Sequence, residues 1–329
     1  GTERISPEML NGYPPEYAVM VALATCWVSC SDDDDKDEPD PTIPTMNEIT
    51  LSVKVGDNGK LTLFNPNYIG EFGEEWEEEI AQYITVPQDL EINWGDGQTT
   101  NSTTHQYDLG GIYQVTIKGT GITSFIFESS KLQSIDITKA PNLVVFSIYW
   151  NQVVKTLDVS KNFDLTYFIC DGNKLTSLDV SKNTKLKILN CGNNNLSSID
   201  VSKNTKLVEL DCEGNNFTSL DVTNNIALKD LYCDNNKLTS LNLSKNTKLI
   251  NLNCSNNQLT SLDLNKNTEL IYLECEENPF TQESVNNLLT SLPMGKYDNG
   301  KPISRLWIDD KWDTSIAEEK GWRINSYNY

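Results

Sequence analysis

The sequence is poor in the residue types on which most catalytic and nucleic-acid sites depend. It contains one histidine, His105, and 26 Lys and Arg against 47 Asp and Glu. The formal net charge of −21 argues against nucleic-acid binding, which needs clustered basic side chains to neutralise phosphates. It also argues against general adhesion to anionic lipid. Basic, cationic and neutral partners stay compatible with this charge.

Recognisable catalytic motifs are missing as well. The chain has no G-x-S-x-G, H-E-x-x-H, phosphate loop or closely spaced metal ligands. His105 has no nucleophile or carboxylate beside it in a known motif. We therefore predict a protein that is not an enzyme, with no catalytic residue, metal or cofactor. A hydrolase that uses carboxylates alone is the enzymatic alternative, because acidic residues are abundant.

Near the N-terminus, a short apolar run precedes a cysteine and a burst of aspartates. Residues 18–29 read AVMVALATCWVS, which is too short to span a membrane, and Cys30 and SDDDDKDE follow. This arrangement resembles the lipoprotein signals of gut-type Gram-negative bacteria. The resemblance implies that Cys30 carries a lipid anchor, with Cys26 as a competing candidate. It also implies a place on the outer-membrane surface, or secretion, with residues 1–45 as signal-like segment and acidic tether.

Residues 46–121 alternate apolar and polar side chains, which predicts β-strands. The predicted strands are ITLSVKV, KLTLF, QYITV, LEINW and YQVTIKG. The segments WGDG, at 94–97, and HQYDLGGIYQV, at 105–115, resemble those of PKD-type immunoglobulin-like domains. The resemblance implies a β-sandwich that acts as a spacer. The acidic run at 71–79 predicts a solvated loop, with a partner contact as the alternative.

The chain is dominated by a 21-residue unit that recurs over residues 165–290. One copy reads LKILNCGNNNLSSIDVSKNTK, and every copy carries L-x-x-(L/F)-x-C-x-x-N-x-(L/F). Two atypical units precede these copies, and the first of them begins at Ile122. They carry Phe127 and Ile148 at the cysteine position, which makes eight units over residues 122–290. The cysteines that share one position are Cys170, Cys191, Cys212, Cys233, Cys254 and Cys275.

A strict period of this length is typical of a solenoid, and the pattern resembles the leucine-rich repeat. The resemblance implies a right-handed solenoid with a parallel sheet on its concave face. One unit cannot fold alone, because each buried side chain contributes roughly 1.5–3 kcal/mol while each ordered backbone costs about 1–2 kcal/mol. Stacked units share a core. The cysteines then form a buried ladder of small apolar groups, and disulfides of a secreted protein are the alternative.

In a leucine-rich repeat, positions three, five, seven and eight of each unit project from the concave face, and the asparagine at position nine supports the backbone. These variable positions are our candidate binding residues. In the first coils they are Tyr149, Trp150, Tyr167, Ile169 and Ile188. In the middle coils they are Glu209, Asp211, Glu213, Asp230, Tyr232 and Asp234, and in the last coil Tyr272, Glu274, Glu276 and Glu277.

Two features of this face favour a contact. Glu209 and Asp230 should lie about 5 Å apart on adjacent strands, where like charges repel by roughly 1 kcal/mol even in water. Solvent or a cationic partner must relieve that repulsion. Exposed Tyr and Trp beside charges are typical of interface hot spots. We predict binding of a protein or peptide, which can be basic. A glycan stacked on the aromatic residues, calcium, and a solvated face without ligand stay open.

The repeat pattern ends after Pro279, and residues 291–329 predict a small α/β cap. A helix is expected over TQESVNNLLTSL with Thr281 as its N-cap, and a short helix over 314–322 that ends at Gly321. RLWID, at 305–309, and WRINSY predict strands. The segment SIAEEKGW resembles the caps of surface leucine-rich-repeat proteins from gut bacteria. Trp307, Trp312 and Trp322 are expected to seal the last coil.

Overall fold

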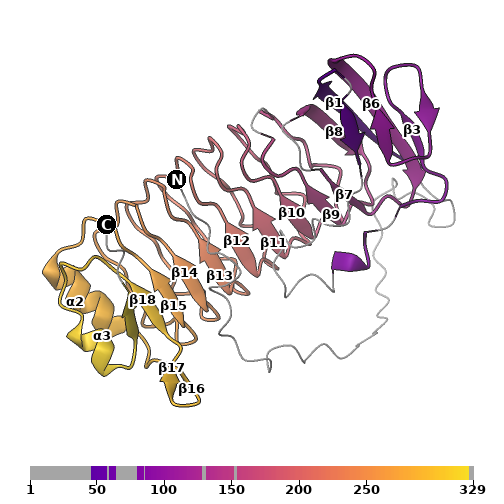
Figure 1. The fold of residues 1–329 in the computed structure, drawn as a ribbon. Coiled ribbons are helices and arrows are strands. Elements are labelled where there is room, and N and C mark those ends of the chain that lie inside the picture. The colour runs from indigo at the N-terminus through magenta and orange to yellow at the C-terminus, as the bar shows by residue number, and fades with distance from the viewer. Residues whose placement is uncertain are drawn as a thin grey trace, which may run out of the picture.

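The computed structural model shows an elongated rod with a β-domain at its N-terminal end (Figure 1). It describes residues 46–57, 59–63, 80–84, 86–127, 131–151 and 154–325. The predicted lipid anchor at Cys30, the acidic tether and the acidic run at 71–79 lie outside these residues.

Two antiparallel sheets form the N-terminal domain, with strand orders β4-β3-β6-β1-β8 and β2-β5. The strands are β1 Met46–Val55, β2 Lys60–Thr62, β3 Glu91–Asn93, β4 Thr99–Thr100, β5 Thr104–Gln106, β6 Gly111–Thr120 and β8 Leu132–Lys139. β1 and β6 pair along their whole length. The alternation of β1 directs Ile49, Leu51 and Val53 into the core, as its sequence predicts.

The WGDG segment forms the turn between β3 and β4, and its neighbours build the core. Gly95 has φ +80°, and a β-carbon there would lie 2.5 Å from the Gln114 carbonyl oxygen. Trp94 is fully buried, and its Nε1 donates to Thr100 Oγ1 at 3.0 Å. The Tyr107 hydroxyl donates to the Trp94 carbonyl at 2.9 Å. Glycine at 95 is required by both its φ and this close approach.

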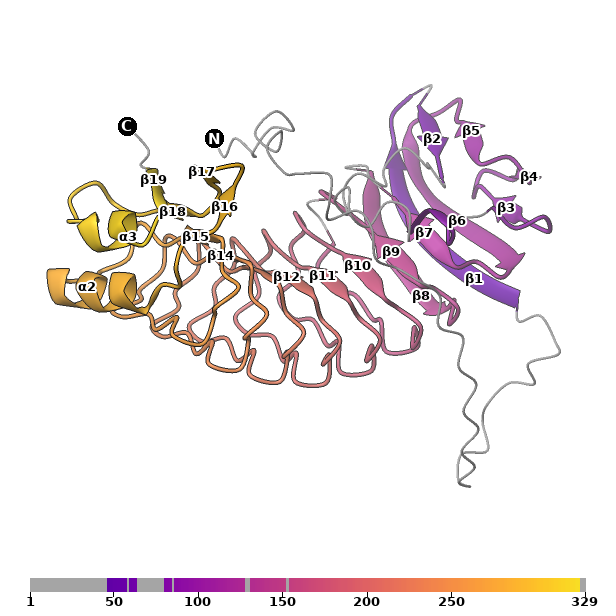
Figure 2. The same cartoon turned by 90° about the horizontal axis from the view of Figure 1, so that it is seen from below.

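A ten-stranded parallel sheet runs along the rod in the order β7-β9-β10-β11-β12-β13-β14-β15-β18-β19 (Figure 2). Its strands are β7 Ser124–Ile126, β9 Val145–Ser147, β10 Tyr167–Ile169, β11 Ile188–Asn190, β12 Glu209–Asp211, β13 Asp230–Tyr232, β14 Asn251–Asn253, β15 Tyr272–Glu274, β18 Arg305–Trp307 and β19 Arg323–Asn325. Neighbouring strands of the repeats pair one unit apart, as Leu210 with Leu231. The predicted leucine-rich-repeat solenoid is confirmed.

The six repeat cysteines are free thiols inside this solenoid. Each is fully buried, which confirms the predicted interior ladder, and none of the six forms a disulfide. Burial is the largest influence on each thiol and raises the pKa of all six. They pack as small apolar groups, and the thiolate form that reacts or binds metal is disfavoured.

The position-nine asparagines join successive coils, as predicted. Asn215 illustrates the pattern: its Nδ2 donates to the carbonyl oxygens of Cys191 and Cys212 at 3.0 and 3.2 Å. Its Oδ1 accepts from the Leu196 N–H at 3.0 Å. Each such amide satisfies backbone groups that the turns leave without a partner.

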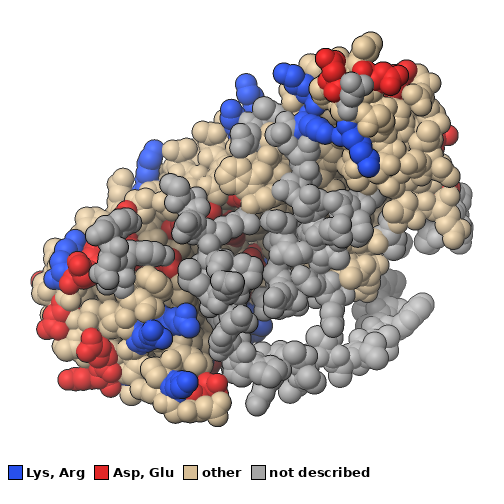
Figure 3. Space-filling view, in the orientation of Figure 1, with Lys and Arg blue, Asp and Glu red and all other residues tan. Residues whose placement is uncertain are grey.

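A second asparagine ladder was not predicted. In the segment around S-K-N, each lysine is exposed, and Lys and Arg side chains recur along one edge of the rod in Figure 3. The asparagine at the end of this segment is fully buried. Asn204 Nδ2, for example, donates to the carbonyl oxygens of Val180 and Asn183 at 3.0 and 2.9 Å. The equivalent residues are Asn162, Asn183, Asn204, Asn225, Asn246 and Asn267.

The first predicted unit is divided between the two parts of the molecule. β7 begins the parallel sheet, whereas β8, later in the same unit, pairs antiparallel with β1 through Leu51 and Ile135. One hydrophobic core therefore continues from the N-terminal domain into the rod. The sequence patterns change at residue 121. The β8 strand comes after that residue in the chain but belongs to a sheet of the N-terminal domain.

The C-terminal helices form where the sequence predicts them, as α2 Gln282–Ser291 and α3 Ser315–Glu319. Thr281 caps α2 by accepting from the Ser284 N–H. A small hairpin of β16 Tyr297–Asp298 and β17 Lys301–Pro302 precedes β18. β18 and β19 extend the rod's parallel sheet, and buried Trp322 donates to the Pro293 carbonyl at 2.9 Å.

Candidate functional site

The parallel strands place equivalent positions of successive coils in straight columns on the concave face. Glu209 pairs with Asp230, and Asp211 pairs with Tyr232. The predicted neighbourhood of Glu209 and Asp230 is therefore confirmed. These columns hold the candidate binding residues, but the structure buries several of them.

Three predicted contact residues at the N-terminal end are not on the surface. Tyr167 is 0%, Ile169 2% and Ile188 1% exposed. The prediction that these side chains are free to meet a ligand is wrong. They belong to a second hydrophobic cluster, on the concave side of the sheet, which also contains Val145 and Ile126.

Residues 80–84 of the N-terminal domain cover this end of the face. Ile80 is fully buried in the cluster, and Tyr83 and Ile84 pack against it. The Tyr83 ring lies 6.5 Å from the Tyr167 ring, centroid to centroid, and the Tyr83 carbonyl accepts from Thr123 Oγ1 at 2.8 Å. The strand predicted over QYITV is wrong. Tyr83 and Ile84 instead bury apolar surface against the solenoid sheet, whereas Val86 is 49% exposed.

Tyr149 and Trp150 remain at the surface of this end. Tyr149 is half-buried, and Trp150 is 42% exposed. Trp150 has φ +50°, which is a genuine outlier for a bulky residue. The later coils also have positive φ at this position, where they carry glycine or asparagine, as in Gly172 and Asn193, except for Glu277 in the last coil. A β-carbon on Gly172 would lie 2.8 Å from the Trp150 ring, so the indole rests directly on the next coil.

The middle coils combine half-buried and buried acids. Glu209, Asp211, Glu213 and Tyr232 are half-buried. Asp230 and Asp234 are 8% and 5% exposed, so their predicted exposure is wrong.

Amide groups of neighbouring residues meet the two buried aspartates. Asn251 Nδ2 donates to Asp230 Oδ1 at 2.5 Å, and Asn235 Nδ2 donates to Asp234 Oδ2 at 2.6 Å. In the last coil, Glu274 is also buried and accepts from the Tyr272 hydroxyl, whereas Glu277 is exposed. These asparagine amides, which the sequence analysis did not consider, therefore relieve part of the repulsion between neighbouring carboxylates on the concave face.

Several of these carboxyl groups have pKa values above those of free side chains. Burial, and then the Glu213 carboxylate, raises the pKa of Asp234 to about 7. Burial, followed by the charges of Glu274 and Asp309, raises the pKa of Glu276 to about 7. The pKa of Asp211 lies well above its usual range because of burial and the nearby Glu213. The face thus keeps acids at a cost in stability, which is typical of functional sites.

This cost predicts that Asp234→Asn stabilises the protein at alkaline pH. The folded pKa of Asp234 is about 7 against 3.8 in a free side chain, so the penalty is absent below about pH 4 and grows as pH rises to 7. Because a tenfold change in proton affinity corresponds to about 1.4 kcal/mol, we expect a gain on the order of 2–4 kcal/mol at pH 8 and little change near pH 4. Urea unfolding at each pH measures it.

Asp221→Asn is the control for this prediction. Asp221 lies outside the sheet, and its pKa is lowered because its carboxylate accepts from the Thr223 N–H. Its contribution is present above its ordinary pKa and is lost only in acid. The Asp221 variant should therefore gain nothing at pH 8. If the free energy of unfolding depended on pH in the same way for wild type and Asp234→Asn, a buried ionisable carboxyl at this position would be contradicted.

The side chains around Gly192 converge in a way that the sequence did not reveal. A β-carbon on Gly192 would lie 2.8 Å from Asp171 Oδ1, 3.2 Å from Asp211 Oδ1 and 3.0 Å from Glu213 Cγ. Asn193 Nδ2 donates to Asp171 Oδ1 at 3.0 Å and to Glu213 Oε1 at 2.7 Å. Two neighbouring coils thus direct acidic side chains over the coil between them. The only sequence signal was a glycine at a position where four of the other five cysteine-bearing coils carry an acid.

Two other features lie away from the concave face. His105 Nε2 is hydrogen-bonded to Asp96 Oδ2 at 2.7 Å, and the His105 ring stacks on Trp94. The carboxylate partner of His105, which the sequence did not reveal, therefore belongs to the WGDG turn.

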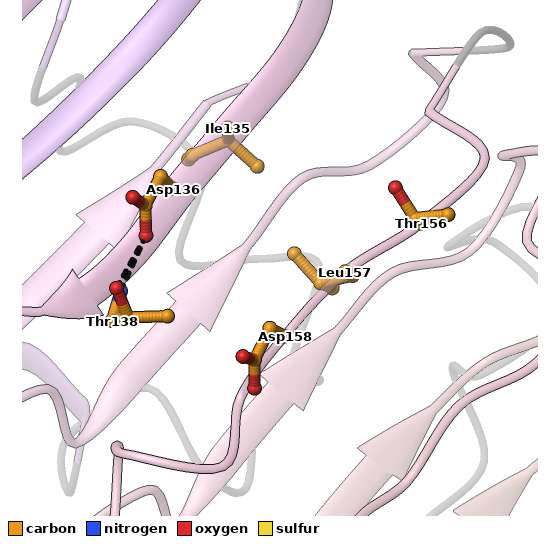
Figure 4. Close-up of a pocket in the computed structure, with 6 residues that line it drawn as sticks. All are labelled: Ile135, Asp136, Thr138, Thr156, Leu157 and Asp158. Atoms are coloured by element: carbon orange, nitrogen blue, oxygen red, sulfur yellow. Dashed lines mark hydrogen bonds between the residues drawn. The ribbon is translucent and has the colours of Figure 1, made fainter.

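A cavity of about 360 Å³ lies between β8 and the next coil (Figure 4). There Asp136 Oδ1 accepts from Thr138. Its lining residues are Ile135, Asp136, Thr138, Thr156, Leu157 and Asp158.

Among the described residues, no group of His, Cys, Asp and Glu has an arrangement that could hold a metal ion. No helix in the same residues is long and apolar enough to cross a membrane.

The fold, its concave sheet and its cysteine ladder define a leucine-rich-repeat solenoid. No protein-family model matches the chain, and no curated protein does. Solved structures of similar shape include leucine-rich-repeat proteins of bacteria.

One similar structure is the functional domain of InlJ from Listeria monocytogenes, described as including a cysteine ladder. It is 30% identical over 62% of this chain and 53% of that one, with a TM-score of 0.36. The internalin InlF of the same species is 23% identical over 63% and 62%, with a TM-score of 0.48. A leucine-rich-repeat protein of Leptospira interrogans is 20% identical over 57% and 46%, with a TM-score of 0.43. The matches span about half to three fifths of those chains.

Proposed function

We propose that this protein is a non-enzymatic recognition module that binds a protein or peptide through the concave face of its solenoid. The carrying observation is Trp150, an exposed indole on a left-handed backbone. The repeat imposes this backbone in every later coil, and tryptophan there costs on the order of 1–3 kcal/mol, so the exposed indole is retained against a cost in stability. Tryptophan is also the residue type most enriched in interface hot spots.

The acidic coils beyond Trp150 support the same proposal. Glu209, Asp211 and Glu213 are half-buried on one face, and the raised pKa of Asp211 marks a carboxylate that a positively charged partner would stabilise. Rim charges of this kind steer association and set specificity. A basic surface is therefore the partner chemistry that we favour. The lipid anchor at Cys30, surface display and a PKD-like spacer remain predictions from the sequence that would suit such a module.

Glycan binding is the alternative that the sequence leaves open, and the structure adds nothing in its favour. Of its three predicted stacking residues, Tyr167 is buried. The rings of Tyr149 and Trp150 are nearly perpendicular, at 75°, so they do not form one flat platform for a sugar ring.

The test is loss of partner binding on Trp150→Ala. Wild-type protein would be immobilised to capture a partner from surface extracts, and binding of that purified partner would be measured by calorimetry. We expect Trp150→Ala to weaken it by roughly tenfold or more, because a hot-spot residue contributes about 2 kcal/mol or more. The melting temperature should stay nearly unchanged.

Phe163→Ala is the matched control, since Phe163 is a 51% exposed aromatic residue outside the sheet. It should leave binding unchanged. A partner whose affinity ignores Trp150, or an oligosaccharide as the captured ligand, would refute recognition of a protein through this face.

A further inference from the structure

Arginine is rare in this chain, and two of its arginines lie side by side on the parallel sheet. Of the 26 Lys and Arg residues, only Arg4, Arg305 and Arg323 are arginine. Arg305 on β18 pairs with Arg323 on β19, at the C-terminal end of the row of strands in Figure 2. Lysine supplies the positive charge along the rest of the rod, so these two positions use a guanidinium where an ammonium is the rule.

The alternation of β18 and β19 directs both arginines to the concave side of the sheet. Leu306 is buried in the core and Ile324 packs against it, so their neighbours in each strand point the opposite way. Arg305 follows Tyr272 in the column of position three. Arg323 is exposed and Arg305 is half-buried, so a ligand on the concave face can reach both guanidinium groups.

In the part of the chain that the structure describes, neither guanidinium forms an ion pair or a side-chain hydrogen bond. The acids of the neighbouring segments have other partners. Glu274 on β15 accepts from the Tyr272 hydroxyl, and Asp309, just after β18, lies 3.3 Å from the Lys311 ammonium. The positive charge of the arginine pair is therefore not neutralised by these acids.

Like charges at directly paired positions of a sheet repel each other. In the acidic coils an amide relieves this repulsion, as where Asn251 donates to Asp230. No side chain among the described residues does the same for Arg305 and Arg323. A bound anion would remove the repulsion, because it attracts both guanidinium groups at once.

The guanidinium group is suited to one kind of anion in particular. Its planar fork of N–H donors matches the two oxygens of a carboxylate, whereas an ammonium group acts as a point charge. Trp307 is half-buried and lies on the same side of β18 as Arg305, and Trp and Arg are the residue types most enriched in interface hot spots. Every protein carries carboxylates, in its acidic side chains and at its C-terminus.

We propose that Arg305 and Arg323 form a site that binds a carboxylate of the partner protein or peptide. This inference rests on the proposed function, since the carboxylate must arrive on a partner that lies along the concave face. It adds the direction of that partner. The acids Glu209 and Asp211 lie on β12, four strand spacings or about 19 Å from β18, so the partner places a basic group there and its carboxylate at the C-terminal end.

The test uses the full chain and two synthetic peptides without terminal charges. Both carry a lysine and, six residues further on, either glutamate or its neutral analogue glutamine, because six extended residues span about 20 Å. Each is titrated against protein with ¹⁵N-labelled arginine, whose side-chain Nε signals are few enough to follow singly. We expect the glutamate peptide to shift the Arg305 and Arg323 signals, to leave Arg4 unmoved, and to bind at least tenfold more tightly than the glutamine peptide.

A third peptide distinguishes the two sources of a carboxylate. It has glutamine in place of glutamate and ends there in a free C-terminal carboxylate. Tighter binding of the glutamate peptide assigns the site to an acidic side chain, and tighter binding of the third peptide assigns it to a chain terminus. Either result supports the site, provided that the same two arginine signals move.

Three substitutions locate the site and a fourth is the control. Arg305→Gln and Arg323→Gln assign the two signals, and each should weaken the glutamate peptide by about tenfold or more. Arg305→Lys keeps the charge but loses the fork, so it should weaken binding by roughly threefold or more. Lys301→Gln removes an exposed cation from the hairpin before β18 and should leave binding unchanged. The urea midpoint of Arg305→Gln should not fall, because the substitution relieves a repulsion.

Equal affinity for the charged and neutral peptides, unmoved Arg305 and Arg323 signals, or unchanged binding by Arg305→Gln would overturn the site. A markedly lower urea midpoint of Arg305→Gln would overturn it as well, since the guanidinium would then stabilise the fold. The natural partner separates this failure from failure of the proposed function. Binding of that partner that depends on Trp150 but on neither arginine overturns the site alone, whereas binding that depends on none of the three overturns both.

Discussion

Tyr167→Ala should destabilise the protein by roughly 3–5 kcal/mol, as expected for truncation of a fully buried aromatic residue. The sequence places Tyr167 on the concave face, where its loss would affect binding only. In the structure its ring is fully buried against Tyr83 and Ile80. The substitution therefore opens a cavity between the N-terminal domain and the solenoid. Urea unfolding monitored by circular dichroism measures the loss.

Tyr232→Ala is the matched control for Tyr167→Ala. Tyr232 lies in the same parallel sheet, three strands further along, and is only half-buried. Its truncation should cost less than about 1 kcal/mol, as at surface positions away from special features. If both tyrosine variants lose the same stability, residues 80–84 do not pack on the sheet as described.

Asn215→Ala is expected to have a similarly large effect, also roughly 3–5 kcal/mol. The Asn215 side chain donates to the carbonyl oxygens of Cys191, Cys212 and Glu213 and accepts from the Leu196 N–H. Removing the amide leaves these buried groups without a partner, and each such group costs about 1–3 kcal/mol. The loss should be visible as a lower urea midpoint.

The neighbouring residue serves as the control for Asn215. Asn216 is half-buried, and its Oδ1 accepts from the Lys237 ammonium at the surface. Asn216→Ala should therefore change stability by less than about 1 kcal/mol, because solvent replaces that bond. A small effect of Asn215→Ala would mean that the asparagine ladder is incidental to stacking.

The Asn215 prediction shows where sequence reasoning succeeds. A strict period repeats one physical environment, so the inward leucines, the buried cysteines and the role of Asn215 follow from a single unit. The caps follow from local rules: Thr281 begins α2, and Gly321, with φ +85°, ends the turn after α3. Local chemistry decides all of these, and no distant contact has to be known.

Sequence reasoning was less successful on the candidate site. The concave positions of Tyr167, Ile188 and Glu209 are equivalent in the repeat, yet two are buried and one is half-buried. The difference comes from a segment more than eighty residues away along the chain from Tyr167. No period connects that segment to the repeats. The buried S-K-N asparagines were missed for another reason, since a polar segment with a lysine predicts a solvated turn.

The sequence by itself determined that the chain stacks 21-residue coils around a cysteine ladder, because each coil must bury its apolar positions against an identical neighbour. Only the tertiary structure decided which part of the concave face is free. The apolar run around Tyr83 covers the N-terminal coils, since burying it there removes two hydrophobic surfaces from water at once. Trp150 and the half-buried acids Glu209, Asp211 and Glu213 are left as the surface on which we propose that recognition takes place.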